Sequence, residues 1–335
     1  YKKRALFVNM DHTDHFVSIV IPTYNEEQYI GDCIDSVLSN DFPRNRTEIL
    51  VVDGCSEDNT CKIVKSYMES YPGVRLLYNE NRYANYGMNL AIRNARGDIV
   101  VRLDAHAFYP SHYISTLLYW MEEERADNVG ALWETLPGKD TDKARSIAKV
   151  LSHPLGVGNA YYRVGISEPK YVDTVPFGCY RKEVFETIGL YDEDMIRNED
   201  DELNGRLKQN GGRILLIPDI KIKYFARTEF SKLSNMMYQY GYFKPLVNKK
   251  LKLPTNYRQF APPVLLILIV LGCISSLFSI WGLLTLVILL GAYLSILFLF
   301  GLNLFDNYRE LVFGIISFVI VHVLRKNYGS GSGAA

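Results

Sequence analysis

The sequence predicts an α/β domain with a Rossmann-like, mostly parallel β-sheet, followed by interfacial helices and two to three transmembrane helices. Two observations lead to this fold class. Between residues 17 and 225, short apolar runs alternate with helical patterns, which is typical of a parallel sheet with helices on both faces. From Phe260 to Leu302 the chain contains no charged residue, and this length is sufficient for two membrane spans of about 20 residues each.

Length and charge limit the classes of function. The 335 residues allow one large domain or two smaller ones. The formal net charge at pH 7 is +0, so no basic field over the whole chain favours nucleic acid as a partner. We therefore expect a membrane-associated protein with a folded aqueous domain and no nucleic-acid partner.

Composition divides the chain into five segments. The expected segments are an N-terminal tail over 1–16, an α/β domain over 17–225, a juxtamembrane amphipathic segment over 226–259, a transmembrane region over 260–325 and a tail over 326–335. Part of the last tail, which ends in GSGSGAA, is expected to be an addition to the natural sequence.

Four strands are expected in the first half of the α/β domain, at the runs VSIVIPTYN, TEILVVDGCS, VRLLYN and DIVVRLD. Helical patterns separate these runs, and the first helix opens at Asn25 or Glu26 with Ile30 and Ile34 on one face. Each strand ends in polar residues. Because ligands bind beyond the carboxyl ends of the strands in such sheets, these polar residues predict a site at that edge.

The second half of the domain is less regular. Residues 151–163, LSHPLGVGNAYYR, are punctuated by glycine and proline and are expected to form a mobile loop. Residues 171–193 predict a strand, a glycine turn and a short helix. The run from Asn198 to Pro218 predicts a helix that starts with carboxylates, a glycine stop and a further strand.

The segment 226–259 mixes aromatic residues with basic ones, which include Lys232 and Lys244. This composition fits amphipathic helices on an anionic membrane surface, although an ordinary solvated linker has a similar composition. The basic residues that precede the first span predict that the α/β domain lies on the cytosolic face of the cell membrane, whereas Arg325 and Lys326 favour the opposite orientation if the run 311–324 spans. The apolar run 311–324 is short, and it is compatible with a third span, a re-entrant helix or an interfacial helix.

Three groups of polar residues could share one chemical task. Asp53 lies between a strand and a helix, where it could bond a base or a ribose. Asp104 and His106 are two residues apart at the end of a strand, so they can point to the same side and hold a divalent ion against a diphosphate. Glu199 and Asp200 open a helix and could accept a proton from an attacking hydroxyl.

Each group also has a simpler interpretation. Asp53 could only cap a helix, His106 could be an ordinary surface imidazole, and carboxylates are favoured at any helix start. The order and spacing of the three groups together favour sugar transfer from a nucleotide-sugar.

Four segments, in this order, resemble the inverting family-2 glycosyltransferases of the GT-A fold: VSIVIPTYNEEQYIGDCIDSVLSN, EILVVDGCSEDNT, GDIVVRLDAHA and NEDDELNGRLKQNGGRI. The DAHA form resembles the subgroup around the succinoglycan-biosynthesis glucosyltransferase, as do VDTVPFGCYRKEVFETIGLYDE and SHPLGVGNAYYR. The similarity extends over about residues 17–325, including the membrane tail.

The resemblance implies a role for several residues of the first half of the domain. Those expected to bind the nucleotide-sugar are Pro22, Tyr24, Glu26, Asp53, Arg82 and Asp104. Asp104 matches the first aspartate of the family's metal-binding DxD motif, and His106 replaces the second, so that Mn²⁺ or Mg²⁺ is the expected cofactor.

The resemblance also implies the catalytic residues. Asp200 matches the carboxylate taken as the catalytic base, with Glu199 beside it. Apart from the resemblance, the residues expected near the acceptor are Gly178, Arg227 and Lys244, although the two basic residues are equally compatible with solvated positive charge next to lipid. The implied reaction is a single displacement that inverts the anomeric carbon and moves a sugar, with glucose as the expected one, from a UDP-sugar to a polyprenyl-diphosphate-linked acceptor in surface-glycan assembly.

Other functions are compatible with such a fold. A processive polysaccharide synthase would carry a QxxRW motif, and the sequence contains no Arg-Trp pair. A non-catalytic GT-A scaffold subunit would be expected to lose a carboxylate, whereas Asp53, Asp104 and Asp200 are all present. A flippase or transporter is disfavoured because the uncharged hairpin holds no ionisable pair. We therefore expect the addition of one sugar per encounter.

Overall fold

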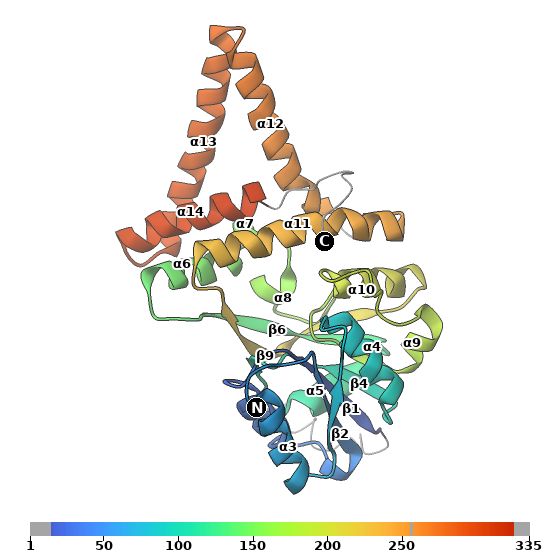
Figure 1. Ribbon diagram of the computed structural model, residues 1–335. Helices are drawn as coiled ribbons and strands as arrows, with labels where there is room; N and C mark the ends of the chain where they lie inside the picture. The colour runs from blue at the N-terminus through green and yellow to red at the C-terminus, as the bar shows by residue number, and fades with distance from the viewer. Residues whose placement is uncertain (1–14, 255–256, 325–335) are drawn as a thin grey trace. The chain divides into compact units, whose positions relative to one another are not determined.

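A computed structural model describes residues 15–254 and 257–324 of the chain (Figure 1). The tails predicted over 1–16 and 326–335 lie outside the described residues, except for His15 and Phe16. The chain divides into two compact units. Unit 1 comprises Tyr1–Glu134 and Gly165–Tyr224, and unit 2 comprises Thr135–Val164 and Phe225–Ala335. Residues 135–164, which were expected to belong to the α/β domain over 17–225, thus pack with the C-terminal helices.

The strands lie in one sheet whose members alternate with helices along the first half of the chain. The strands are β1 (Val17–Thr23), β2 (Thr47–Asp53), β3 (Val74–Tyr78), β4 (Ile99–Arg102), β5 (Ala107–Phe108), β6 (Asn128–Pro137), β7 (Lys170–Tyr171), β8 (Cys179–Arg181) and β9 (Ile214–Ala226). The helices of the same part of the chain are α2 (Ile30–Leu38), η2 (Arg44–Arg46), α3 (Thr60–Ser70), α4 (Ala84–Asn94), α5 (Tyr113–Glu123), α9 (Glu183–Ile188) and α10 (Glu199–Gln209).

The first half of the sheet is parallel, as the sequence predicts. Strand β1 pairs in parallel with β2 on one side and with β4 on the other, and β2 pairs with β3. The strands are buried on both faces, as their near-continuous apolar runs require. Since the pairing aligns Thr23 with Asp53, the ends of these strands lie at one edge.

The second half of the sheet is antiparallel, so the sheet is mixed rather than mostly parallel. The strand order is β3-β2-β1-β4-β8-β6-β9-β5, with β7 also paired to β9. Strand β8 runs antiparallel to β4 and to β6, and β9 runs antiparallel to β5 and β7. The strands β5, β7 and β8 have only two or three residues each. Such short strands carry too little periodicity for their direction to be predicted.

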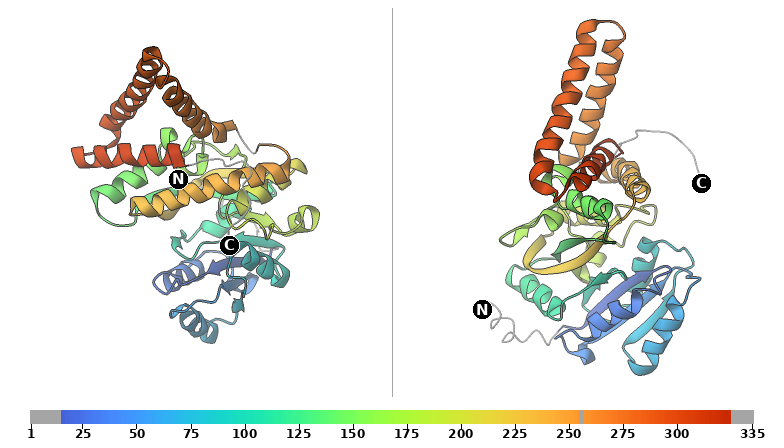
Figure 2. Two further views of the ribbon diagram at one scale, coloured as in Figure 1. Left: turned by 45° about the horizontal axis from the view of Figure 1, so that its top comes forward. Right: turned by 90° about the vertical axis from the view of Figure 1, so that its left-hand side faces the viewer.

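Unit 2 is helical, apart from the ends of β6 and β9. Its helices are α6 (Asp142–Leu151), α7 (Pro154–Val157), α8 (Tyr161–Val164), α11 (Phe230–Leu251), η3 (Tyr257–Phe260), α12 (Ala261–Ser276), α13 (Ile280–Leu304) and α14 (Tyr308–Leu324). Helices α12 and α13 form a long hairpin (Figure 2, right). Of the described helices, α13 is long and apolar enough to cross a membrane, and α12 is a shorter apolar helix. The predicted pair of apolar helices is therefore present, and one of them has the length of a span.

Helix α14 packs inside unit 2, against α6, α11 and α13. The segment 151–163, predicted as a mobile loop, instead contains α7 and α8. Its backbone is bonded to α14, because Nε2 of His322 donates a hydrogen bond to the carbonyl oxygen of Leu155 at 2.7 Å, while Nδ1 of the same ring lies 2.9 Å from the Tyr293 hydroxyl of α13.

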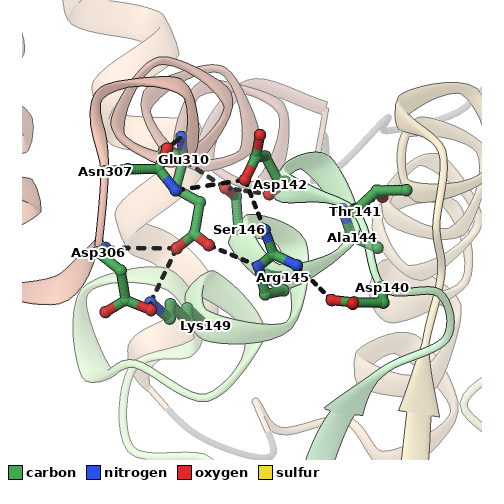
Figure 3. Close-up of polar contacts among 10 residues, drawn as sticks. All are labelled: Asp140, Thr141, Asp142, Ala144, Arg145, Ser146, Lys149, Asp306, Asn307 and Glu310. Carbon is green, nitrogen blue, oxygen red and sulfur yellow. Dashed lines mark hydrogen bonds and ion pairs between the residues drawn. The ribbon is translucent and has the colours of Figure 1, made fainter.

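A buried carboxylate joins α14 to α6 (Figure 3). The side chain of Glu310 is 1% exposed, and its two oxygens accept hydrogen bonds from Nε of Arg145 at 2.7 Å and from Nζ of Lys149 at 2.9 Å. The Glu310 backbone N–H donates to the Asn307 side chain, which caps the helix. Both cations come from α6, so one carboxylate fastens the two helices together.

We expect the substitution Glu310→Gln to lower the thermal stability of the protein. The amide keeps the shape of the side chain, but it leaves Arg145 and Lys149 without their buried negative partner, and breaking a buried ion pair is costly. The apparent Tm of the purified protein in detergent should fall by about 5 °C. The control is Asp140→Asn, because Asp140 pairs with the same Arg145 from a side chain that is 94% exposed. This variant should shift Tm by about 1 °C or less. Equal Tm values for the two variants would contradict the role of Glu310.

Candidate active site

Asp53 closes strand β2 with a buried carboxylate. Its residue is 1% exposed, and Oδ2 accepts a hydrogen bond from the backbone N–H of Ser56 at 3.0 Å. The other oxygen, Oδ1, is buried and has no hydrogen-bond partner among the described residues. Because a buried acceptor without a donor is costly, Asp53 is suited to receive an N–H or O–H group of a ligand.

The loops after β1, β2 and β3 meet around Gly54. The Gly54 N–H donates to the carbonyl oxygen of Thr23 at 2.8 Å, and a Cβ atom on Gly54 would lie 2.8 Å from the Arg82 carbonyl oxygen. Each loop also contains one non-glycine residue in the left-handed region: Asn25 at φ 54°, Cys55 at φ 64° and Arg82 at φ 65°. Such conformations are costly, and they persist where the surrounding structure holds them.

Asp104 and His106 converge after strand β4, together with Glu26 from the loop after β1. Nδ1 of His106 lies 2.9 Å from Oδ1 of Asp104 and 3.0 Å from Oε1 of Glu26. The backbone N–H of Asp104 donates to the Tyr109 hydroxyl at 2.7 Å. Burial opposes protonation of the imidazole, but the hydrogen bonds and charges of Asp104 and Glu26 raise the pKa of His106 to about 11. Nδ1 of the ring therefore lies within hydrogen-bond distance of two carboxylates.

Asp200 and Glu199 open helix α10 and share one arginine. Nη1 of Arg102 lies 2.5 Å from Oδ1 of Asp200, and Nη2 lies 2.9 Å from Oε1 of Glu199. The Tyr191 hydroxyl donates to the same oxygen of Asp200 at 3.4 Å. Burial raises the pKa of Asp200 to about 7 against the opposing attraction of Arg102, and the charges of Glu199 and Asp201 also raise it. A carboxylate with a pKa near neutrality can take up a proton during a reaction.

Helix α4 holds the segment that leads to Asp200. The side-chain N–H groups of Asn85 donate to three backbone carbonyl oxygens, those of Asp192, Glu193 and Met195, at 3.0 to 3.1 Å. Asn89 bonds the backbone of Tyr191 through both its amide nitrogen and its oxygen. Both asparagines are 1% exposed, so the path of residues 191–195 is determined by buried amides.

The other predicted site residues are distributed as follows. Pro22 is half-buried in β1, while Tyr24 and Arg82 are exposed in the loops after β1 and β3. Gly178 is tightly packed, because a Cβ there would lie 2.3 Å from Oδ1 of Asn128.

Two predicted acceptor residues belong to unit 2. Arg227 follows β9 and is exposed, and Lys244 lies on α11 and is buried. Asp53 and the pair Asp104 and His106 thus follow parallel strands at one edge of the sheet, and Asp200 is bonded to Arg102 of β4. The two basic residues expected near the acceptor belong to unit 2.

Two contacts among the residues of the candidate site were not predicted from the sequence. The position of Glu26 against His106 depends on the fold of the loop after β1. Arg102 of β4 binds Glu199 and Asp200, which lie 97 and 98 residues later in the sequence. The sequence does indicate that Arg102 needs a partner, because it is a charged residue inside the apolar run IVVRL and a buried charge must be paired.

Comparison with known proteins identifies related chains. A family model described as Glycosyl transferase family 2 matches residues 18–189. A dolichyl N-acetyl-α-D-glucosaminyl phosphate 3-β-D-2,3-diacetamido-2,3-dideoxy-β-D-glucuronosyltransferase of Methanococcus voltae is 30% identical over 70% of this chain and 75% of its own. The succinoglycan biosynthesis protein ExoA of Rhizobium meliloti (strain 1021) is 30% identical over 67% of each chain.

A solved structure shares the fold over nearly the whole length. A mannosyltransferase of Pyrobaculum calidifontis, in complex with GDP-Man and Mn²⁺, aligns with a TM-score of 0.60 at 19% identity, over 97% of this chain and 93% of that one. The similarity supports the predicted GT-A architecture, with a mixed sheet in place of a mostly parallel one.

We expect the substitution Gly54→Ala to destabilise the protein, because the added methyl group would meet the backbone oxygens of Arg82 and Thr23. The three loops would have to separate, and overpacking of this kind typically costs about 1–3 kcal/mol. The matched control is Gly31→Ala on α2, where the nearest atom to a Cβ is 3.6 Å away. Thermal unfolding of the two variants should show a lower Tm for Gly54→Ala only. A Tm equal to that of the unmodified protein would mean that the loops do not meet at Gly54.

Proposed function

Because the chain belongs to glycosyl transferase family 2, we propose that it is a membrane-anchored inverting glycosyltransferase that moves one sugar from a UDP-sugar to a polyprenyl-diphosphate-linked acceptor. The observation that carries this proposal is the gathering of three functional groups at one sheet edge in unit 1. Asp53 ends β2, Asp104 and His106 follow β4, and Arg102 of β4 holds Asp200. A donor-binding carboxylate, a diphosphate site and a base are the parts that the reaction requires.

The donor binds, in this proposal, with its nucleoside at Asp53. The unpartnered Oδ1 of Asp53 accepts a hydrogen bond from the uracil or the ribose. Pro22 and Tyr24 lie on the neighbouring strand β1 and its loop, and Arg82 lies in the loop that contacts Gly54. We propose glucose as the transferred sugar, on the basis of the subgroup resemblance.

A divalent ion, Mn²⁺ or Mg²⁺, fits the pair Asp104 and His106. Among the described residues no group of three or more His, Cys, Asp or Glu side chains converges as a complete metal site. The pair supplies one oxygen and one nitrogen on side chains that are 26% and 30% exposed, which leaves room for diphosphate oxygens and water as further ligands. When bound, the ion would neutralise charge on the diphosphate. To hold the ion, the His106 imidazole would have to be in its neutral form.

In the proposed reaction, a side chain of the protein takes up the proton that the acceptor hydroxyl loses. Asp200 takes the proton from the acceptor hydroxyl, whose oxygen forms a bond to the anomeric carbon. The bond from that carbon to the diphosphate breaks, and its electron pair leaves with UDP. A single displacement of this kind inverts the configuration, so an α-linked donor gives a β-linked product.

The proposed acceptor is lipid-linked, and unit 2 is the proposed membrane anchor. The relative from Methanococcus voltae bears a name that includes a dolichyl phosphate, which supports a lipid-linked acceptor for this chain. Helix α13 has the length and composition of a span, and the apolar side chains of the α12–α13 hairpin are exposed over most of its length. The localisation proposed is the cell membrane, with unit 1 in the cytosol.

The first test measures UDP release by the full-length protein in detergent. The assay contains Mn²⁺ or Mg²⁺, a polyprenyl-linked sugar and one donor from a panel of UDP-sugars, with GDP-mannose as the alternative nucleotide. We expect release from one UDP-sugar that increases with the lipid acceptor. Asp200→Asn should lower the rate by about 10²–10⁴-fold, because the amide cannot accept the proton. Donor binding, measured by calorimetry with UDP and metal, should be retained.

The matched control is Asp194→Asn, because Asp194 lies in the same acidic segment but is exposed. This variant should keep the rate of the unmodified protein. Binding of UDP without release from any donor would favour a non-catalytic scaffold subunit, and long products from a single acceptor would favour a processive synthase. Either outcome would contradict the proposal.

A second test concerns the membrane anchor. Ile288 is the ninth of the 25 residues of α13, and 69% of its surface is exposed. Ile288→Arg should reduce the fraction of protein that stays in the membrane pellet after alkaline extraction, because an arginine at the centre of a span costs about 2.5–3.5 kcal/mol. Tyr257→Arg, at an exposed position of η3 beside a native arginine, is the control and should be retained. Equal retention of the two variants would argue against lipid contact of α13.

A further inference from the structure

Arg102 is a buried cation in the interior of unit 1. It ends strand β4, two residues before Asp104, and its side chain is 9% exposed. Nη1 of the guanidinium group bonds Asp200 at 2.5 Å, and Nη2 bonds Glu199 at 2.9 Å. The two carboxylates are neighbours in sequence at the start of α10, so a single planar group holds both at once.

The groups that face Asp200 come from β4, α10, β8 and the segment between α9 and α10. Arg102 of β4 is positive, and Glu199 and Asp201 of α10 are negative. The Tyr191 ring lies 5.8 Å from the guanidinium carbon of Arg102, and the buried Tyr180 of β8 also interacts with Asp200. Within this group one cation faces three carboxylates. The ionised state of Asp200 therefore depends strongly on Arg102.

A second observation sets Arg102 apart from an ordinary structural ion pair. Its Nε–H group is buried and has no hydrogen-bond partner among the described residues. An unsatisfied buried donor costs about 1–3 kcal/mol, and native structures tolerate few of them. The backbone N–H of Arg102 also donates to the carbonyl oxygen of Gly178 at 3.0 Å. The position of the guanidinium is thus maintained at an energetic cost, which indicates a functional role.

We propose that Arg102 is a positioning residue for the catalytic base: its rigid fork fixes the direction of the Asp200 carboxylate and keeps it ionised, while Glu199 shares the fork and limits this effect. The inference rests on the proposed function and extends it to a residue outside the set of donor, metal and base groups. Lysine cannot replace arginine fully, because an ammonium group lacks the planar pair of donors that bonds two carboxylates at fixed angles.

The proposal predicts pH shifts of opposite sign for the two partners of Asp200. Burial already raises the pKa of this carboxyl to about 7, and Arg102 opposes the rise. Removal of the cation in Arg102→Gln raises the pKa further, so the base form is reached only at higher pH. Removal of the neighbouring negative charge in Glu199→Gln lowers the pKa, so the base form is reached at lower pH.

The experiment is the pH dependence of kcat for UDP release by the full-length protein with metal, donor and lipid acceptor, over about pH 5.5–9. For Arg102→Gln we expect the acidic limb to move up by about one pH unit or more, and the rate near pH 7 to fall about tenfold. Glu199→Gln should move the limb down, and Arg102→Lys should fall between Arg102→Gln and the unmodified protein. The KM for the donor should stay within about threefold of the value for the unmodified protein, because the proposal gives the Arg102 guanidinium no role in donor binding.

The control is Arg93→Gln, because Arg93 is a surface arginine with a side chain that is 59% exposed. Its pH profile should match that of the unmodified protein. Calorimetric binding of UDP verifies that each variant is folded, and if Arg102→Gln does not fold, Arg102→Lys and Glu199→Gln still test the opposite shifts. Unchanged pH limbs in folded, active variants would overturn the role of Arg102. An inactive unmodified protein that binds UDP would instead overturn the proposed function, so the two failures are distinguishable.

Discussion

The parallel pairing of β1 with β2 and β4 is the constraint on which the candidate site depends. It aligns Thr23 with Asp53 and Val20 with Arg102, so that the loops after three strands share one edge of the sheet. The loops after β1, β2 and β3 approach so closely that only a glycine fits at position 54. The pairing is maintained by apolar residues buried on both faces, and the polar chemistry begins where that burial ends.

Much of this arrangement could be predicted, because it depends on local patterns. The four parallel strands appear as apolar runs, and their polar ends place Asp53, Asp104 and His106 at the expected edge. The apolar hairpin appears as an uncharged stretch. Strands β5, β7 and β8 could not be predicted in direction, because their partners lie far away in sequence and a strand of two or three residues has no recognisable period.

The partners of the charged side chains could not be predicted for the same reason. Glu26 meets His106 across 80 residues of sequence, and Arg102 meets Asp200 across 98. A pattern shows that a charge lies in an apolar run, and it therefore shows that some partner is needed. It does not show which of several carboxylates supplies that partner, because this choice is made by the topology of the sheet and by the buried amides of α4.

Arg102 and Glu310 both follow the rule that a buried charge needs partners of opposite charge, but the two ion pairs have different consequences. Each is a buried charge bonded to two groups of opposite charge on a single helix, α10 for Arg102 and α6 for Glu310. Glu310 meets cations that have other, partly exposed partners, so its main consequence is to fasten helices together. Arg102 meets carboxylates in a site that is otherwise negative, so its consequence reaches the protonation of Asp200. The same kind of interaction therefore fastens helices in one unit and affects the charge of Asp200 in the other, and the difference lies in the charges that surround it.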